Sequence, residues 1–276
     1  MPGVASALAV LSIAGAALAA PVADAPRSPP SAGTVGIAYS IAFWGIPFGM
    51  TSYDGRFSPG SYAASSHFET SGIVSLFWQA AIDASATGRI GPGALQPSQY
   101  DSWFRRGDSK KERVQVTFDR GSVSTFADPP YDTTKYPVTE AEKRDAVDPM
   151  SAIALVLTGT RADRANPCGT VAPVFDGRRR YDIEFTYIKD EPVALAGGLF
   201  RGTAHLCQMH YRQIAGFKPK ILKEGAALPP IFGDFADIPA AGAPNGHYVV
   251  LLKAWAQLSW GVVSAQLTSL RVPARS

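Results

Sequence analysis

Hydrophobic and polar residues alternate with a period of two over much of the chain, which predicts β-strands. The clearest case is 113–118, where Val114, Val116 and Phe118 alternate with polar side chains. The same alternation, or a strand-like composition, predicts further strands at 39–43, 62–69, 181–187, 200–212, 247–256 and 260–272. Glycines punctuate these segments as turns. The pattern therefore favours an antiparallel, mainly β protein.

Four other segments lack this alternation. Gly72 opens a mostly apolar run, 73–78, which we expect to be another strand. The charged cluster at 105–113 carries both signs and is typical of a solvated loop before a strand. Pro-rich sequence at 127–147 and 218–245 predicts long connections.

One segment has a convincing helical signature. Asp148 can cap a helix that begins at Pro149 and ends before Gly159, and 150–158 is mostly apolar. A helix that is apolar on nearly all sides is expected to be buried. The sequence thus predicts a single antiparallel, strongly curved sheet or an open β-barrel or spiral, with one or two short helices.

The amino terminus has the features of an export signal. Residues 1–20 carry no charge, are rich in small apolar residues, and end in Ala17-Leu18-Ala19, a cleavage pattern. No Lys or Arg precedes the apolar run, and a transmembrane anchor is the alternative. We expect a signal peptide at 1–19 cleaved after Ala19, a flexible Pro/Ala-rich leader at 20–33, and one β-rich domain at 34–272. The processed protein would be periplasmic and not integral to the membrane.

The chain contains two cysteines, Cys168 and Cys207. An even count in an exported protein favours a disulfide, whereas two buried free thiols are the alternative for a cytosolic protein.

Composition narrows the function classes. A hydrophobic fraction of 46% with 11% aromatic residues is enough to build a core and excludes wholesale disorder. The formal net charge is only +3, which is not typical of a nucleic-acid-binding protein. We therefore expect no nucleic-acid partner.

No motif points to catalysis or to a cofactor. His205, Cys207 and His210 lie close in sequence, but on a strand His210 would face away from the other two, so no metal site is predicted. Neither a nucleophile elbow nor a phosphate-binding glycine loop is present. A hydrolase using Asp148 or Asp176 as its acid remains an alternative.

Two groups of residues are candidates for ligand binding. Asp176 and Gly177 predict a hairpin turn, after which Arg178 and Arg180 share one strand face. These arginines either meet an anionic head group or pair with acids around the turn, and the structural role is favoured. The aromatic residues Trp44, Phe68, Trp78 and Trp255 belong either to the core or to an apolar site on a concave sheet.

The chain resembles a family of exported bacterial proteins, DUF3108, whose function is not known. The resemblance covers roughly residues 33–272. It rests on the order of a first strand with Tyr39, the segment from Gly72, Asp148-Pro149 before an apolar helix, Cys168, the run 174–182, and Cys207 followed by Tyr211 and 214–217.

The resemblance implies a periplasmic β-rich fold, similar by analogy to the LolA/LolB lipoprotein carriers, and it transfers no catalytic residues. We predict a non-catalytic envelope protein that binds a lipid, an acyl chain or an envelope protein on the concave face of its sheet. A periplasmic hydrolase acting on an envelope polymer and a structural envelope scaffold are the alternatives.

Overall fold

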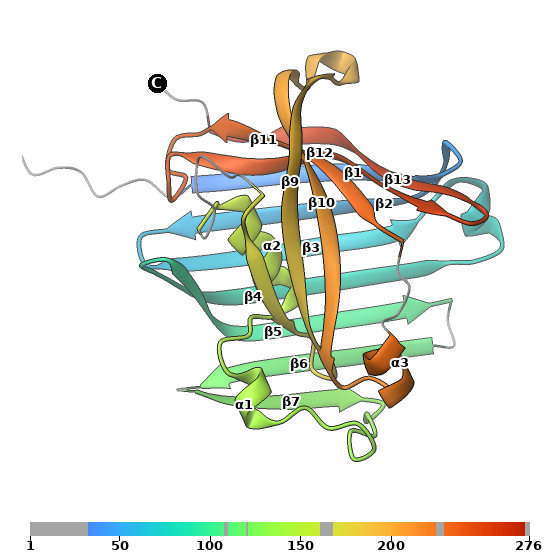
Figure 1. The fold of residues 1–276 in the computed structure, drawn as a ribbon, viewed down its shortest axis with the longest axis vertical. Coiled ribbons are helices and arrows are strands. Elements are labelled where there is room, and N and C mark those ends of the chain that lie inside the picture. The colour runs from blue at the N-terminus through green and yellow to red at the C-terminus, as the bar shows by residue number, and fades with distance from the viewer. Residues whose placement is uncertain (1–32, 108–109, 120, 161–167, 225–228, 274–276) are drawn as a thin grey trace, which may run out of the picture.

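A computed structural model describes residues 33–107, 110–119, 121–160, 168–224 and 229–273 (Figure 1). The predicted signal peptide lies outside these residues, as does nearly all of the predicted leader. Thirteen strands form one antiparallel sheet in the order β7-β6-β5-β4-β3-β2-β1-β13-β12-β11-β10-β9-β8. The mainly β fold class predicted from the alternation is confirmed.

The strands are β1 (Gly33–Phe43), β2 (Ile46–Ser58), β3 (Ser61–Thr70), β4 (Ala80–Gly91), β5 (Ala94–Arg106), β6 (Lys110–Asp119), β7 (Ser122–Asp128), β8 (Val171–Phe175), β9 (Arg180–Ala194), β10 (Arg201–Ala215), β11 (Ile231–Pro239), β12 (His247–Leu258) and β13 (Gly261–Arg271). The helices are α1 (Glu140–Lys143), α2 (Pro149–Leu157) and α3 (Pro219–Glu224), with two 3-10 helices, η1 (Gly72–Leu76) and η2 (Ala196–Gly198).

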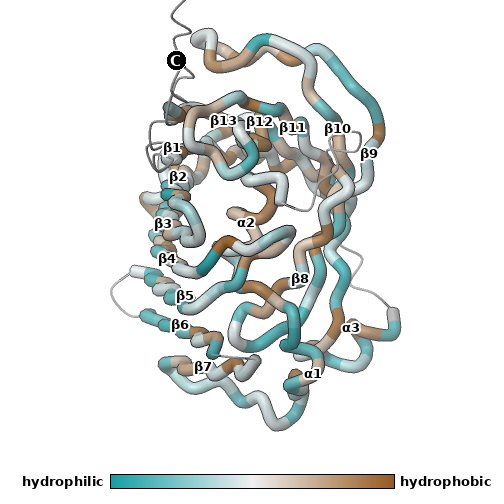
Figure 2. The backbone as a smooth tube through the Cα atoms, turned by 90° about the vertical axis from the view of Figure 1, so that its left-hand side faces the viewer, coloured by the Kyte–Doolittle hydropathy of each residue, from teal (hydrophilic) through white to brown (hydrophobic). Residues whose placement is uncertain are grey.

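The sheet curls so that its two halves face each other. Strands β1–β7 form one wall, β8–β10 cross in front of them, and β11–β13 connect the two (Figures 1 and 2). Pairing of β1 with β13 joins the two ends of the described chain. Register shifts within β1, β10 and β11 add bulges, which sharpen the local bend and twist.

The two edge strands, β7 and β8, are not hydrogen-bonded to each other, so the barrel is open. Part of the space between them is a cavity of about 540 Å³, lined by residues of β7, of the segment after it and of the β8–β9 turn. The β8–β9 turn places Gly177, with φ of +93°, so close to Val114 that a Cβ there would lie 2.6 Å from the valine Cγ1. The Asp-Gly turn therefore brings the β8–β9 hairpin against the inner face of β6.

Helix α2 forms where the sequence predicts it, and it lies between the two walls (Figure 2). Asp148 caps it by accepting a hydrogen bond from the Ser151 backbone N–H at 2.9 Å, and Pro149 occupies the first turn. Leu155 and Ala154 are fully buried. One prediction was too simple, because Ile153 remains 45% exposed on a helix expected to be buried on nearly all sides.

Two other predictions were wrong. The apolar run at 73–78 is not a strand: η1 and the residues after it form the connection between β3 and β4, and η1 buries none of its residues. This mostly apolar run has no clear period, so its sequence cannot distinguish a buried strand from an exposed connection. The proposed connection at 218–245 contains β11, a strand hidden in the sequence by its flanking prolines and glycines.

The charged segment 105–113 is also more ordered than expected. Arg105 and Arg106 end β5, and Lys110 begins β6, so most of the predicted loop belongs to these two paired strands.

Candidate ligand-binding cavity

A predominantly apolar cavity of about 440 Å³ lies between the β1–β3 wall, helix α2 and the opposite wall. Its size falls within the ~300–1,000 Å³ typical of small-molecule sites. Strands β1–β3 contribute Ile37, Tyr39, Thr51, Ser52, Tyr53 and Ser66. Helix α2 contributes Pro149, Ala152, Ile153, Val156 and Leu157. The opposite wall contributes Ala172, Tyr181, Ile183, Phe185, Met209, Phe235, Val249 and Leu251.

The fold explains why this space stays open. Two sheet walls that cross each other diverge away from the crossing, and a short helix fills only part of the volume between them. Ile153 is exposed because it faces this cavity, which it helps to line, and not a neighbouring element.

The few polar groups in the lining are hydroxyls. The Tyr39 hydroxyl donates to the Leu251 backbone carbonyl at 2.9 Å, tying β1 to β12, the next strand but one in the sheet. The Ser66 hydroxyl lies 3.2 Å from the Met150 sulfur. The Tyr53 hydroxyl is buried and has no hydrogen-bond partner among the described residues. Burial raises the pKa values of Tyr39 and Tyr53 above the ordinary range, so both side chains are neutral.

The disulfide lies directly behind one end of the cavity. Cys168 and Cys207 are joined, which confirms the pairing expected from the sequence. Both are buried against Phe235 and Val249, which also line the cavity, with Val156, Phe185 and Leu251 packed around them. The disulfide therefore fixes the α2–β8 connection to β10 where three cavity walls meet.

Asp148, one of the two acids considered for hydrolysis, caps α2 and is fully buried. Its carboxylate accepts hydrogen bonds from the Ser151 N–H at 2.9 Å and from the Ser151 hydroxyl at 2.5 Å. The Tyr62 hydroxyl lies 2.6 Å from the same serine oxygen. Burial raises the pKa of Asp148 to about 6, although the hydrogen bonds from Ser151 oppose that shift.

The raised pKa of Asp148 has a measurable consequence. A carboxyl whose pKa is higher in the folded state stabilises the fold at low pH, and that contribution is lost as the pH rises through the folded-state value. Asp148→Asn keeps an acceptor for the helix cap but cannot ionise. Urea unfolding should show the variant gaining stability relative to wild type between about pH 4 and pH 7, by ~3 kcal/mol at most. A difference that stays constant with pH would contradict the shift.

Asp176, the other acid, belongs to the β8–β9 turn. It accepts hydrogen bonds from the backbone N–H groups of Arg178 and Arg179 at 2.9 and 2.7 Å. Burial raises its pKa, and those hydrogen bonds and both guanidinium groups act against the shift. The Asp176 carboxylate therefore stabilises the β8–β9 turn through these two hydrogen bonds.

The arginines that follow Asp176 are separated in space. Arg178 lies over the Tyr131 ring, 5.1 Å from its centre. Arg180 pairs with buried Asp182 at 2.5 Å and donates to the Glu142 carbonyl at 3.0 Å. The structure does not bring these residues together as one anion site, and each has a structural partner.

The four candidate aromatic residues do not line the cavity. Phe68 pairs in register with Thr51, a lining residue, so it shares the inner face of the sheet next to the cavity. Trp255 stacks with Phe232, with Lys253 5.1 Å from its ring centre. Trp44 and Trp78 are exposed in the β1–β2 and β3–β4 connections.

Sequence reasoning thus missed most of the site. Its strand alternation did place Tyr39, Tyr181, Ile183 and Phe185 on the inner faces of strands, but gave no reason to group them with Ile153 and Val156 on a helix. Such a grouping depends on how the sheet curls.

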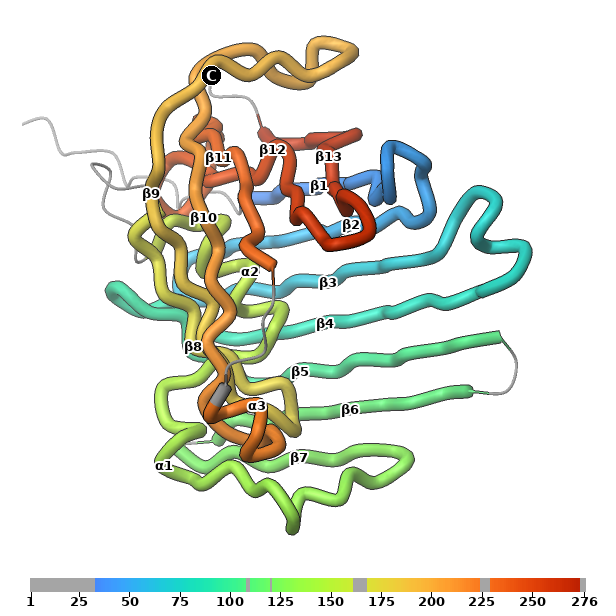
Figure 3. The backbone as a smooth tube through the Cα atoms, turned by 45° about the vertical axis from the view of Figure 1, so that its right-hand side comes forward, coloured from blue at the N-terminus to red at the C-terminus, as the bar shows by residue number. Residues whose placement is uncertain are grey.

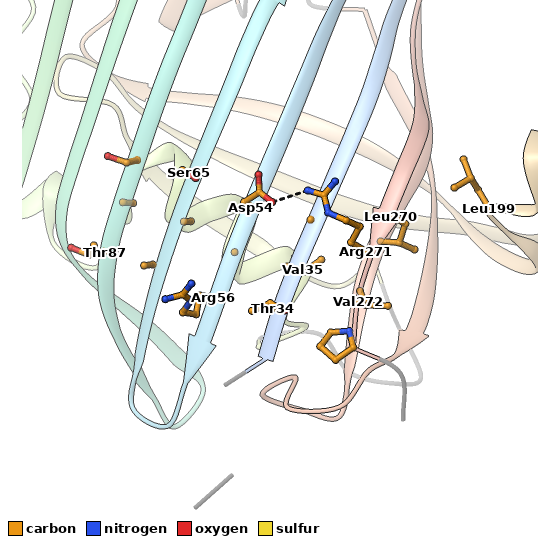
Figure 4. A pocket seen from close by; sticks show the side chains of 17 residues that line it. Thr34, Val35, Asp54, Arg56, Ser65, Thr87, Leu199, Leu270, Arg271 and Val272 are labelled. Carbon is orange, nitrogen blue, oxygen red and sulfur yellow. Dashed lines mark hydrogen bonds and ion pairs between the residues drawn. The ribbon is translucent and has the colours of Figure 1, made fainter. Parts of the chain in front are cut away.

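A larger depression of about 970 Å³ crosses β1–β4 and β13 (Figure 4). Its rim includes the exposed residues Thr34, Arg56 and Ser65, and an ion pair of 3.1 Å joins Arg271 to Asp54. It is wide open, and its side chains are mostly small. The apolar cavity is therefore the better candidate for holding a ligand.

Two further properties concern the described residues as a group. They contain no cluster of three or more His, Cys, Asp or Glu side chains that could hold a metal ion. His205 instead lies 2.7 Å from Asp190, and Cys207 is in the disulfide. Within the same part of the chain, none of the helices has the length and apolar character needed to cross a bilayer.

Comparison with known proteins gives a fold and a family. The crystal structure of a β-barrel-like protein of domain of unknown function DUF1849 from Brucella abortus superimposes with a TM-score of 0.52. At 12% sequence identity, the match covers 88% of this chain and 98% of that one, which shows a shared fold. No curated protein matches the chain. The family model described as "Protein of unknown function (DUF3108)" matches residues 38–226, well over half of the chain. The chain therefore belongs to the DUF3108 family.

Proposed function

We propose that this protein is a non-catalytic binding protein of the bacterial periplasm that holds a lipid or an acyl chain. The observation that carries the proposal is the cavity between α2 and the two walls of the sheet, whose lining is almost entirely aliphatic and aromatic. An apolar chain entering it would remove its own surface and that of Ile153 and the other lining side chains from water.

The polar groups of the lining suit an apolar ligand. The Tyr39 hydroxyl is already bonded to the Leu251 carbonyl, and the Tyr53 hydroxyl oxygen is buried with no surface open to the cavity. Neither group offers a hydrogen bond to a ligand. We infer that the part of the ligand held in the cavity is apolar.

The positions of the two candidate acids favour binding over hydrolysis. A general acid must reach the bond that it protonates. Asp148 is buried in the helix cap, and Asp176 is bonded to the backbone of its own turn. Neither lines the apolar cavity. The hydrolase alternative has no comparable observation in its favour.

The proposed compartment rests on two features. The uncharged start with its Ala17-Leu18-Ala19 pattern is typical of an export signal, and the disulfide is compatible with an oxidising compartment.

Native mass spectrometry tests the binding function. The chain would be produced in a bacterial periplasm, purified without detergent, and measured under native and denaturing conditions. We expect the native mass to exceed the denatured mass by a dissociable species of lipid size. A bare native mass, together with no binding of the apolar dye N-phenyl-1-naphthylamine, would contradict the proposal and favour a structural scaffold.

A further inference from the structure

One end of the sheet carries exposed aromatic and aliphatic residues on three neighbouring connections. In an up-and-down sheet alternate turns lie at the same end, and the β1–β2, β3–β4 and β12–β13 connections project together at the right of Figure 1 and again in Figure 3. We call the exposed large apolar residues on them the aromatic rim: Trp44, Ile46, Ile73, Leu76, Phe77, Trp78 and Trp260.

Contacts between the three connections make the rim continuous. The Trp44 backbone N–H donates to the Val262 carbonyl at 2.9 Å, which ties the β1–β2 turn to β13. The centre of the Phe43 ring lies 5.2 Å from the centre of the Trp44 ring and 4.9 Å from that of the Trp260 ring. On the other side, the Ser71 N–H donates to the Phe48 carbonyl at 2.8 Å and attaches η1 to β2.

Exposing the side chains of the aromatic rim to water costs free energy. Leu76 is 76% exposed and Phe77 is 87% exposed, and η1 buries none of its residues. Trp44 adopts a φ of +49°, a conformation that bulky side chains rarely adopt, in a turn where Asn or Gly would be unstrained. Exposed apolar patches and backbone strain of this kind mark interaction surfaces.

The next two strand ends along the same end of the sheet, those of β5 and β6, carry basic residues. Where β5 meets β6, Arg106 pairs in register with Lys110, and Arg105 with Lys111. Arg105 forms an ion pair with Asp83 and Lys110 with Glu112. Arg106 and Lys111 form no ion pair with a described residue, so positive charge lies beside the rim.

We propose that the aromatic rim docks on the surface of a phospholipid bilayer. Three tryptophans suit the boundary between head groups and acyl chains, because an indole is apolar with one hydrogen-bond donor. Leu76 and Phe77 would enter the acyl region, while Arg106 and Lys111 would meet lipid phosphates. The chemistry fits a bilayer better than one protein partner, since the apolar side chains stand on separate turn tips flanked by cations.

The rim also lies at the end of strands that line the cavity. Tyr39 lines the cavity, and Phe43 ends the same strand at the rim. On the inner face, Phe68 pairs with Ile82, and Ile82 pairs with Phe104, which extends an apolar row from the cavity wall across β3–β5. Docking at this end would bring that row close to the bilayer, but the proposal does not require an occupied cavity.

Vesicle flotation tests the docking. The probes are vesicles of phosphatidylcholine alone and of phosphatidylcholine with phosphatidylglycerol in equal parts. Wild type should float with both and more strongly with the anionic mixture. The double variant Leu76→Ser/Phe77→Ser should lower the partition coefficient by about tenfold or more, because it removes the most exposed apolar side chains. Ile188→Ser, an equivalent change at a 43% exposed residue of β9, should bind as wild type does.

Two further measurements show whether a loss of vesicle binding comes from misfolding, and whether vesicle binding depends on the cavity. The double variant should still bind N-phenyl-1-naphthylamine as wild type does. Brominated phosphatidylcholine should quench tryptophan emission in wild type. Wild-type protein that stays in the lipid-free fraction with both vesicle types would overturn the proposal, as would equal loss of binding in the Ile188→Ser control.

Discussion

Ile153→Glu is expected to reduce the affinity for an apolar ligand by about a hundredfold or more. The side chain projects from α2 into the cavity and is 45% exposed there, so its replacement removes little core packing. A carboxylate at this position would have to lose its water beside the ligand without a cationic partner, which costs ~3 kcal/mol or more. Titration with N-phenyl-1-naphthylamine and competition with a fatty acid measure the change.

The chain offers a matched control for this variant. Ile188 is also an isoleucine, is 43% exposed, and lies on β9 outside the cavity lining. Ile188→Glu should keep wild-type affinity and a wild-type far-ultraviolet circular dichroism spectrum. If Ile153→Glu retained its affinity, the ligand would bind elsewhere and the cavity assignment would be wrong.

Replacing both cysteines is expected to have the largest effect on stability. The disulfide between Cys168 and Cys207 closes a loop with a sequence separation of 39, for which the chain-entropy estimate is about 4 kcal/mol. The double variant Cys168→Ala/Cys207→Ala also leaves space beside Phe235 and Val249, so ligand affinity should fall together with stability.

Urea unfolding of the double variant and of oxidised wild type measures the loss, with wild type kept in a reducing agent as a second comparison. Reduced wild type should resemble the double variant. Equal urea midpoints of unfolding for all three samples would show that the disulfide contributes nothing to the stability of the fold.

The sequence predicted the elements whose signal is local. Alternation at 113–118 reports which side chains face the core, since strand residues alternate faces whatever the strand pairs with. At 181–187 it holds for Tyr181, Ile183 and Phe185 but fails for Tyr187, which is exposed, and Asp182 on the other face is buried. The cap at Asp148 and Pro149 fixed the start of α2 for a similar reason, because a helix start depends on neighbouring residues. The family followed from the order of such segments.

Local signals failed where the environment decides. The run at 73–78 is apolar enough for a buried strand, yet it is exposed because β3 already ends at Thr70, whose hydroxyl bonds the Trp78 carbonyl at 3.0 Å. Trp44 and Trp78 were candidates for a ligand site on the concave face, whereas they stand on the rim at the end of the sheet.

By itself, the sequence determined the strands with clear alternation, the central helix and the cysteine pair that could form a disulfide. The cavity was decided only by the tertiary structure. Tyr39, Ile153 and Phe185 are far apart in sequence, and they come together because the bulged sheet curls until its walls cross over α2. That curvature depends on the twist summed over thirteen strands and on how the β8–β9 turn packs against β6, and no short segment encodes either quantity.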